Sequence, residues 1–233
     1  MTGSPIVATR EEWLDARKAL LDRERAILHD LDAVRASRRA LPWVRVERDY
    51  AFEGPGGAVT LSALFGDRTQ LAIYHFMLTP GSDHICPGCA FTMDHVDAAR
   101  RHFEQADLAF AAVSRASVAQ IEAARSRMGW TFTWVSCGEG PFNYDFDVSF
   151  TEQDRRDGTA AYNYGLTTIQ RSPDMFGVSI FAKDGEGELF HTYSTYHRGT
   201  ELLIGAFNWL DLTPKGRSET GGTMSWVRLH DEY

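Results

Sequence analysis

Hydrophobic positions between residues 9 and 39 recur at the three-to-four-residue spacing of an amphipathic helix. The apolar face of this helix would carry Trp13, Leu20, Ile27, Leu31 and Val34. Thr9 and Glu12 stand at capping-box spacing, so each side chain can accept a hydrogen bond from a free amide at the helix start. Pro42 ends the segment. Residues 1–42 are therefore expected to form an N-terminal helical extension that packs on the domain or pairs with a second subunit.

From residue 43 onward the pattern changes to that of an α/β domain. Residues 43–52 alternate apolar and charged side chains, as a half-exposed strand does. Residues 71–78 and 108–114 are continuous apolar runs, which suit strands buried on both faces of a parallel or mixed sheet. A segment with helical periodicity follows each buried run. These segments are residues 91–103 and 117–129.

The second half of the domain is less regular. Residues 131–137 are expected to form a short strand, and residues 138–172, which are polar and irregular, an insertion or long loop. The turn "DGEG" joins two strands of a hairpin over residues 176–196. Residues 199–210 are expected to close the domain with a helix, and residues 211–233 to form a C-terminal tail.

The order of these elements is that of thioredoxin. It runs strand, helix, strand, helix, insertion, hairpin and helix. The sequence thus predicts an α/β, thioredoxin-like fold over residues 43–210, with a central mixed sheet flanked by helices. The N-terminal helical extension and the long insertion are additions to it.

Cys86 and Cys89 stand where the first buried strand passes into the first helix of this order. Free N–H groups and a partial positive charge at a helix N-terminus favour a thiolate, so the pKa of Cys86 is expected to be lowered. Cys89, one turn further on, can attack a mixed disulfide formed by Cys86. Pro87 suits the first helical turn. The sequence predicts a thiol–disulfide oxidoreductase that needs no cofactor.

Other side chains are candidates for the surroundings of the thiols. His84 lies two residues before Cys86 and could tune the thiolate or relay protons. His191 and Tyr193 share one face of their strand and could form a substrate-binding wall, or a solvated strand face. Pro173 precedes the hairpin, near the place where thioredoxin folds put a cis-proline that faces the cysteines, but a simple loop proline fits as well.

Metal binding is the main alternative use of the cysteines. Cys86, Cys89, His84 and His95 lie within twelve residues and offer the sulfur and nitrogen ligands of zinc or copper. No second cysteine or histidine pair at ligand spacing exists, so a remote residue would have to complete the shell. Two further possibilities remain open. The cysteines could be inert and buried, or the protein could be an interaction module that dimerises through its N-terminal helix and residues 199–210.

The sequence does not match the motifs of two enzyme classes. A thiol peroxidase of the peroxiredoxin type has Pro seven and Thr or Ser three residues before its reactive cysteine. Thr79 and Asp83 occupy those places here, with Pro80 one position off. A zinc deaminase has His-x-Glu upstream of its cysteines, whereas "HFE" stands downstream in this chain.

Composition sets the broad class. The 233 residues are 43% hydrophobic with a formal net charge of −8, as in a globular protein without the basic surface that nucleic acid requires. Three cysteines are too few for a disulfide framework. No signal peptide and no apolar run of ~18–20 residues is present, so a cytoplasmic protein without membrane partners is expected. Its partner would be a protein or small-molecule thiol or disulfide.

Long stretches of the chain resemble a bacterial thioredoxin-like family, domain of unknown function 899. They include "RRALPWVRVERDYAFEGPGG", "CPGCAF" and "FHTYSTYHRGTELLIGAFNWLDLTPKGR". The resemblance implies a thioredoxin-like fold with an N-terminal helical extension, and redox positions at Cys86 and Cys89. It implies no particular activity. The order Pro-Gly between the cysteines departs from the Gly-Pro of thioredoxin, which affects the reduction potential and the choice of partner.

Overall fold

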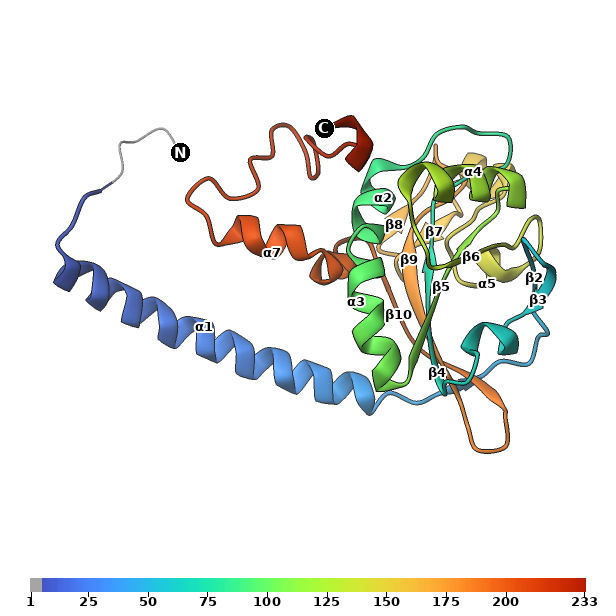
Figure 1. The fold of residues 1–233 in the computed structure, drawn as a ribbon, viewed down its shortest axis with the longest axis horizontal. Helices are drawn as coiled ribbons and strands as arrows, with labels where there is room; N and C mark the ends of the chain where they lie inside the picture. The colour runs from blue at the N-terminus through green and yellow to red at the C-terminus, as the bar shows by residue number, and fades with distance from the viewer. Residues whose placement is uncertain (1–5) are drawn as a thin grey trace. The chain divides into compact units, whose positions relative to one another are not determined.

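The computed structural model describes residues 6–233, and the chain divides into two compact units, Met1–Pro42 and Trp43–Tyr233. In its described residues, 6–42, the first unit contains the helix α1 (Arg10–Arg39) (Figure 1). Its capping box is as predicted, because the Thr9 hydroxyl accepts from the Glu12 N–H and the Glu12 carboxylate accepts from the Thr9 N–H. No residue of α1 is buried.

The second unit is built on an eight-stranded mixed sheet with the order β1-β10-β9-β4-β5-β6-β2-β3. β4 is parallel to β5 and β5 to β6, whereas β9 is antiparallel to β4 and to β10. The strands are β1 (Val44–Arg45), β2 (Ala51–Gly54), β3 (Gly57–Thr60), β4 (Gln70–His75), β5 (Leu108–Ser114), β6 (Thr133–Ser136), β9 (Gly177–Lys183) and β10 (Leu189–Tyr196). Three parallel strands, β4, β5 and β6, with the antiparallel β9–β10 hairpin beside them form the thioredoxin-like fold that the sequence predicts.

Helices and short helical turns connect and flank the strands. The α-helices are α2 (Pro87–Met93), α3 (Val96–Phe103), α4 (Val118–Met128), α5 (Phe142–Asp145), α6 (Glu152–Asp157) and α7 (Gly205–Asp211). The 3-10 helices are η1 (Ser62–Phe65), η2 (Glu104–Ala106), η3 (His197–Leu203) and η4 (His230–Glu232). A separate hairpin pairs β7 (Ala161–Tyr162) with β8 (Thr167–Thr168). Within the described residues, no helix is both long and apolar enough to cross a membrane.

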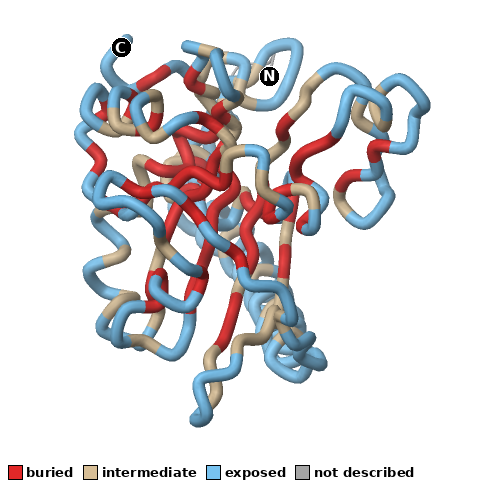
Figure 2. Tube along the Cα trace, turned by 90° about the vertical axis from the view of Figure 1, so that its right-hand side faces the viewer, coloured by how far each residue is buried: buried red, intermediate tan, exposed pale blue. Residues whose placement is uncertain are grey.

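The sheet separates two hydrophobic cores, because successive residues of a strand point to opposite faces. Along β4, Tyr74 belongs to the core that also holds Cys89 and residues of α4. Ile73, its neighbour in sequence, belongs to the core that holds Phe142 of α5. Figure 2 shows the buried segments gathered in the interior, with exposed segments around them. The cysteine pair thus lies on the α4 side of the sheet.

Several element boundaries differ from the sequence-based expectation. The helix expected over residues 91–103 is two helices, with the break at Asp94 and His95. The closing helix expected over residues 199–210 is the 3-10 helix η3 followed by α7. Periodicity continues through both breaks, so it could not reveal where one helix ends and the next begins.

Residues 138–172, expected to be irregular, contain α5, α6 and the β7–β8 hairpin. They also supply fully buried side chains such as Phe142, Val148 and Tyr162. Residues 211–233 carry the buried Leu229, and Trp226 packs against Phe91 of α2 with ring centroids 5.7 Å apart. Both segments therefore contribute to packing around the cysteine-bearing helix and its sheet.

Candidate functional site

Cys86 occupies the N-cap position of α2, directly after the loop that leaves β4. Its backbone is extended, with φ −61° and ψ 116°, and Pro87 begins the helix. The Cys86 sulfur accepts a hydrogen bond from the Cys89 N–H at 3.4 Å. Cys89 lies one turn into the helix and is 1% exposed, whereas Cys86 is only partly buried. Both thiols are free in the structure.

The two cysteines differ in their acidity. The hydrogen bond from the Cys89 thiol, helped by the backbone N–H groups of Cys89 and Gly88, outweighs burial and lowers the pKa of Cys86 to about 7. Burial, followed by the interaction with the Cys86 sulfur, raises the pKa of Cys89 well above its ordinary value. Near neutral pH, Cys86 is therefore partly thiolate while Cys89 keeps its proton. This division suits one attacking and one resolving sulfur.

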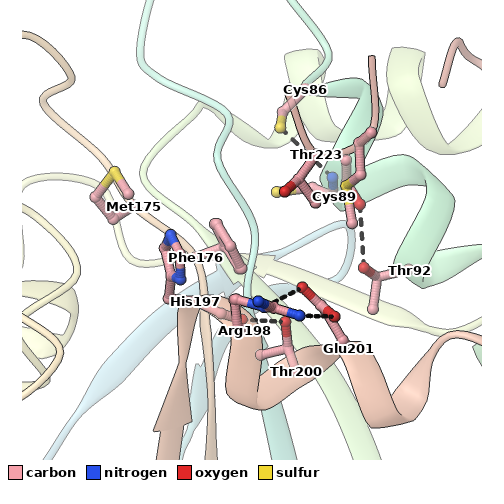
Figure 3. Close-up of a pocket in the computed structure, with 12 residues that line it drawn as sticks. Cys86, Cys89, Thr92, Met175, Phe176, His197, Arg198, Thr200, Glu201 and Thr223 are labelled. Carbon is pink, nitrogen blue, oxygen red and sulfur yellow. Dashed lines mark hydrogen bonds and ion pairs between the residues drawn. The ribbon is translucent and has the colours of Figure 1, made fainter. Parts of the chain in front are cut away.

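A pocket of about 270 Å³ opens over the two cysteines (Figure 3). α2 forms one side, and the segment before β9 and the turns of η3 form two others. Residues of the C-terminal segment complete the wall. The lining residues include Cys86, Cys89, Met175, Phe176, Arg198, Glu201 and Met224. The partly buried Cys86 and the buried Cys89 thus both line this pocket.

The segment that carries Met175 is held by a buried ion pair. Arg115 donates to the Asp174 carboxylate at 2.8 Å, and the two side chains are only 9% and 4% exposed. Thr79 and Ser149 donate further hydrogen bonds to the same carboxylate, each at 2.6 Å. These contacts anchor the segment that carries Met175 to Arg115, Thr79 and Ser149.

An ionic cluster occupies the η3 side of the pocket. Glu201 accepts hydrogen bonds from Arg198 at 3.0 Å and from Arg217 at 2.9 Å. Burial alone would raise the pKa of Glu201, but the two guanidinium groups hold it below its ordinary value. Glu201 therefore stays a carboxylate near neutral pH and is unsuited to donate a proton.

Met224 comes from the C-terminal segment and lies over the turn between the cysteines. A Cβ atom placed on Gly88 would lie 3.2 Å from the Met224 sulfur. Met224 also has φ 61°, in the left-handed region that few side chains adopt. The packing of Met224 against Gly88 narrows the space beside the thiols.

The other sequence-based site residues lie away from the pocket lining. His84 is exposed, and its backbone N–H donates to the Ser82 hydroxyl at 3.2 Å. The carbonyl of Pro173 accepts from the Phe150 N–H, and the neighbouring Met175 and Phe176 face the pocket instead.

His191 and Tyr193 lie on β10. The His191 ring packs 5.2 Å from Phe146 and 5.6 Å from Phe181, both of which belong to the core on the opposite face of the sheet from Cys89. Its Nε2 atom lies 2.8 Å from the Ser194 hydroxyl. Tyr193 is partly buried and does not line the pocket. The structure therefore brings Cys86 and Cys89 together, without these two residues.

The residues of the metal hypothesis are not gathered into a ligand set. Both ring nitrogens of His95 are engaged, with Nδ1 2.7 Å from the Phe91 carbonyl and Nε2 accepting from the Ala206 N–H at 3.1 Å. In the part of the chain that the structure describes, no three histidine, cysteine or acidic residues lie together as metal ligands would. Cys86 and Cys89 are thus left without the two histidines that the hypothesis assigned to them.

A family described as "Bacterial protein of unknown function (DUF899)" matches residues 2–233. No curated protein matches the chain. Similar solved structures include a cysteine-to-serine mutant of PrxQ from Xylella fastidiosa, at 15% identity and a TM-score of 0.46, covering 72% of this chain and 94% of that one. The bacterioferritin comigratory protein of Xanthomonas campestris has 20% identity, a TM-score of 0.44 and coverages of 70% and 95%. Peroxidoxin BcpB of Mycobacterium tuberculosis has 13% identity, a TM-score of 0.47 and coverages of 71% and 96%. At these identities and TM-scores, the three solved structures carry no argument about the chemistry of this chain.

Proposed function

The chain belongs to the DUF899 family, and because the description of that family names no activity, we propose from the site itself that the protein is a thiol–disulfide oxidoreductase. One observation carries the proposal. The Cys86 sulfur lines a pocket and accepts the Cys89 N–H, with a pKa lowered to about 7, while the buried Cys89 remains a thiol. A low-pKa sulfur with a second thiol one turn away is the arrangement that disulfide exchange requires.

In the reducing direction, the Cys86 thiolate attacks one sulfur of a substrate disulfide. A bond forms between the Cys86 sulfur and that substrate sulfur, and the other substrate sulfur leaves with the electron pair and is protonated by water. Cys89 then attacks the Cys86 sulfur, and its proton passes to the departing second thiolate. The dithiol loses two electrons and the substrate gains them. This exchange uses the two thiols alone, without a cofactor.

The dimensions of the pocket indicate how a substrate would approach. Its volume of about 270 Å³ accommodates a small disulfide, or one cysteine of an extended protein segment. Met175, Phe176 and Met224 offer apolar contact on several sides. We therefore expect a protein or small-molecule disulfide with an apolar group next to its sulfur.

The decisive variants are single serine replacements. Cys86→Ser should abolish the reduction of a chromogenic disulfide, which is followed by the absorbance of the thiol that it releases. Cys89→Ser should release one thiol per chain and then stop as a mixed disulfide, which mass spectrometry of the intact chain detects. Cys137→Ser is the matched control, because burial raises the pKa of Cys137 to about 12 and the residue lies outside the pocket lining. Turnover by Cys86→Ser at the wild-type rate would refute the proposal.

We also propose that α1 pairs with the same helix of a second chain. Trp13, Leu20, Ile27 and Val34 repeat every seven residues and remain 48–64% exposed. A repeat of seven is the period at which helices supercoil around one another. Sedimentation of the full chain should give a dimer, and Leu20→Lys with Ile27→Lys should give a monomer. A monomeric wild-type chain at micromolar concentration would contradict this pairing.

A further inference from the structure

The hydroxyl of Tyr74 is a buried polar group without a hydrogen-bond partner. Tyr74 lies on β4 and is 1% exposed, and its hydroxyl oxygen makes no hydrogen bond within the described structure. Leaving a buried donor unpaired destabilises a fold, so an unpaired hydroxyl at a central strand calls for an explanation.

The surroundings of this hydroxyl suggest one. Tyr74 and Cys89 belong to the same hydrophobic core and are each 1% exposed. Burial, and after it the Cys89 and Cys86 sulfurs, raise the pKa of Tyr74 well above its ordinary value. The phenol therefore keeps its proton, and within the core that it shares with Cys89 it is a potential hydrogen-bond donor.

The other hydroxyl near the pair is already engaged. Thr92 donates to the Gly88 carbonyl at 3.0 Å, within the helix that carries both cysteines (Figure 3). Its proton is therefore committed to the backbone, whereas the proton of Tyr74 is free. Tyr74 is the side chain that can offer a new hydrogen bond when charge appears on Cys89.

We propose that the Tyr74 hydroxyl is held unpaired in the resting protein so that it can donate a hydrogen bond to the Cys89 sulfur as that sulfur becomes a thiolate. This inference rests on the proposed disulfide exchange. In the resolving step the Cys89 S–H bond breaks, a bond forms between the Cys89 and Cys86 sulfurs, and the substrate sulfur departs with the electron pair and takes the proton. Tyr74 keeps its own proton throughout. A donor fixed in advance where charge develops stabilises the transition state without reorganisation.

The Tyr74 hydroxyl would act on the resolving step, in which Cys89 attacks, and not on the first step, in which Cys86 attacks the substrate. Cys86 obtains its low pKa from the Cys89 thiol and from backbone N–H groups. Removing the Tyr74 hydroxyl should therefore leave the attack by Cys86 unchanged. The resolving step should slow, because the buried Cys89 has then lost a donor to its thiolate.

The test compares Tyr74→Phe with Tyr50→Phe in single turnovers with a disulfide that releases two chromophoric thiols. Tyr50 is the matched control, since its hydroxyl donates to Asp145 at 2.7 Å in the core on the opposite face of the sheet. In Tyr74→Phe, release of the first thiol should match wild type. Release of the second should slow about tenfold, and its pH midpoint should rise by about one unit, as expected for loss of a charge-assisted hydrogen bond. Tyr50→Phe should change neither step.

Two outcomes separate the possible failures. If the second step in Tyr74→Phe keeps the rate and the pH midpoint of wild type, the proposed role of Tyr74 is wrong, but the disulfide exchange is unaffected. Absence of thiol release in the wild-type chain would refute the exchange itself. A second measurement is made at equilibrium and does not depend on turnover. It follows the Cβ chemical shift of Cys89 against pH in the Cys86→Ser variant, which gives the pKa of Cys89. Adding Tyr74→Phe to that chain should raise this pKa by about one unit, and no change would contradict the inference.

Discussion

The Cys86 sulfur and the Cys89 backbone N–H are joined by a hydrogen bond of 3.4 Å across the first turn of α2. The bond can form because Cys86 is the N-cap residue with an extended backbone, which turns its side chain back over the helix start. The same turn places the Cys89 side chain in the core. One local conformation thus gives two identical side chains different acidities.

This difference predicts a pH dependence of stability. Folding lowers the pKa of Cys86 from 9.0 to about 7, so between these values the folded chain binds fewer protons than the unfolded chain. The stabilisation that Cys86 contributes is fully present above pH 9.0, the pKa of its thiol in the unfolded chain. It is lost as the pH falls through about 7, the pKa of the thiol in the folded chain.

Urea unfolding of wild type and of Cys86→Ser, below pH 7 and near pH 9, measures this contribution. The advantage of wild type should grow with pH by an amount on the order of 1–3 kcal/mol. An advantage that is constant, or that shrinks with rising pH, would show that folding does not favour the thiolate.

Asp174 should stabilise both the fold and the pocket wall. Its carboxylate is 4% exposed and receives Arg115, Thr79 and Ser149, so Asp174→Asn leaves the Arg115 charge buried without its main partner. We expect a loss of about 3–5 kcal/mol in urea unfolding. Glu139→Gln is the control, because Glu139 binds the same arginine while 73% exposed and should cost less than about 1 kcal/mol. Equal losses in the two variants would contradict the assigned role.

Met224 should restrict which disulfides reach Cys86. Its side chain covers Gly88, so Met224→Ala should speed the reduction of bulky disulfides several-fold while leaving small ones almost unchanged. The alkylation pKa of Cys86 should not move, because Met224 makes no hydrogen bond to that sulfur. The ratio of rates for a large and a small substrate gives the readout. An unchanged ratio would mean that the C-terminal segment does not limit access.

Much of the architecture follows from patterns that the sequence displays. The buried run at residues 108–114 coincides with β5, the capping box at Thr9 opens α1, and the helical segment at residues 117–129 contains α4. These features depend on local spacing alone. The thioredoxin-like order of elements could be inferred for the same reason.

The pocket was less accessible to such reasoning, because its walls come from segments distant in sequence. Met224 lies in a polar stretch without periodicity, and nothing local indicates that it packs on Gly88. Phe142 and Tyr162 are buried although no hydrophobic repeat marks their segments, since short elements bury single side chains without a repeat. The histidines near the cysteines suggested a metal site by proximity in sequence, whereas the engagement of both His95 nitrogens is a tertiary feature.

The acidity of Cys86 is the most direct test of disulfide exchange. The rate of alkylation of Cys86 by iodoacetamide should be followed against pH, with peptide mapping to separate Cys86 from Cys89 and Cys137. The structure predicts a single transition with a midpoint near pH 7, and a Cys86–Cys89 disulfide that forms on oxidation and is reversed by dithiothreitol. A midpoint at or above the ordinary thiol value of 9.0, without a reversible disulfide, would contradict the proposed function.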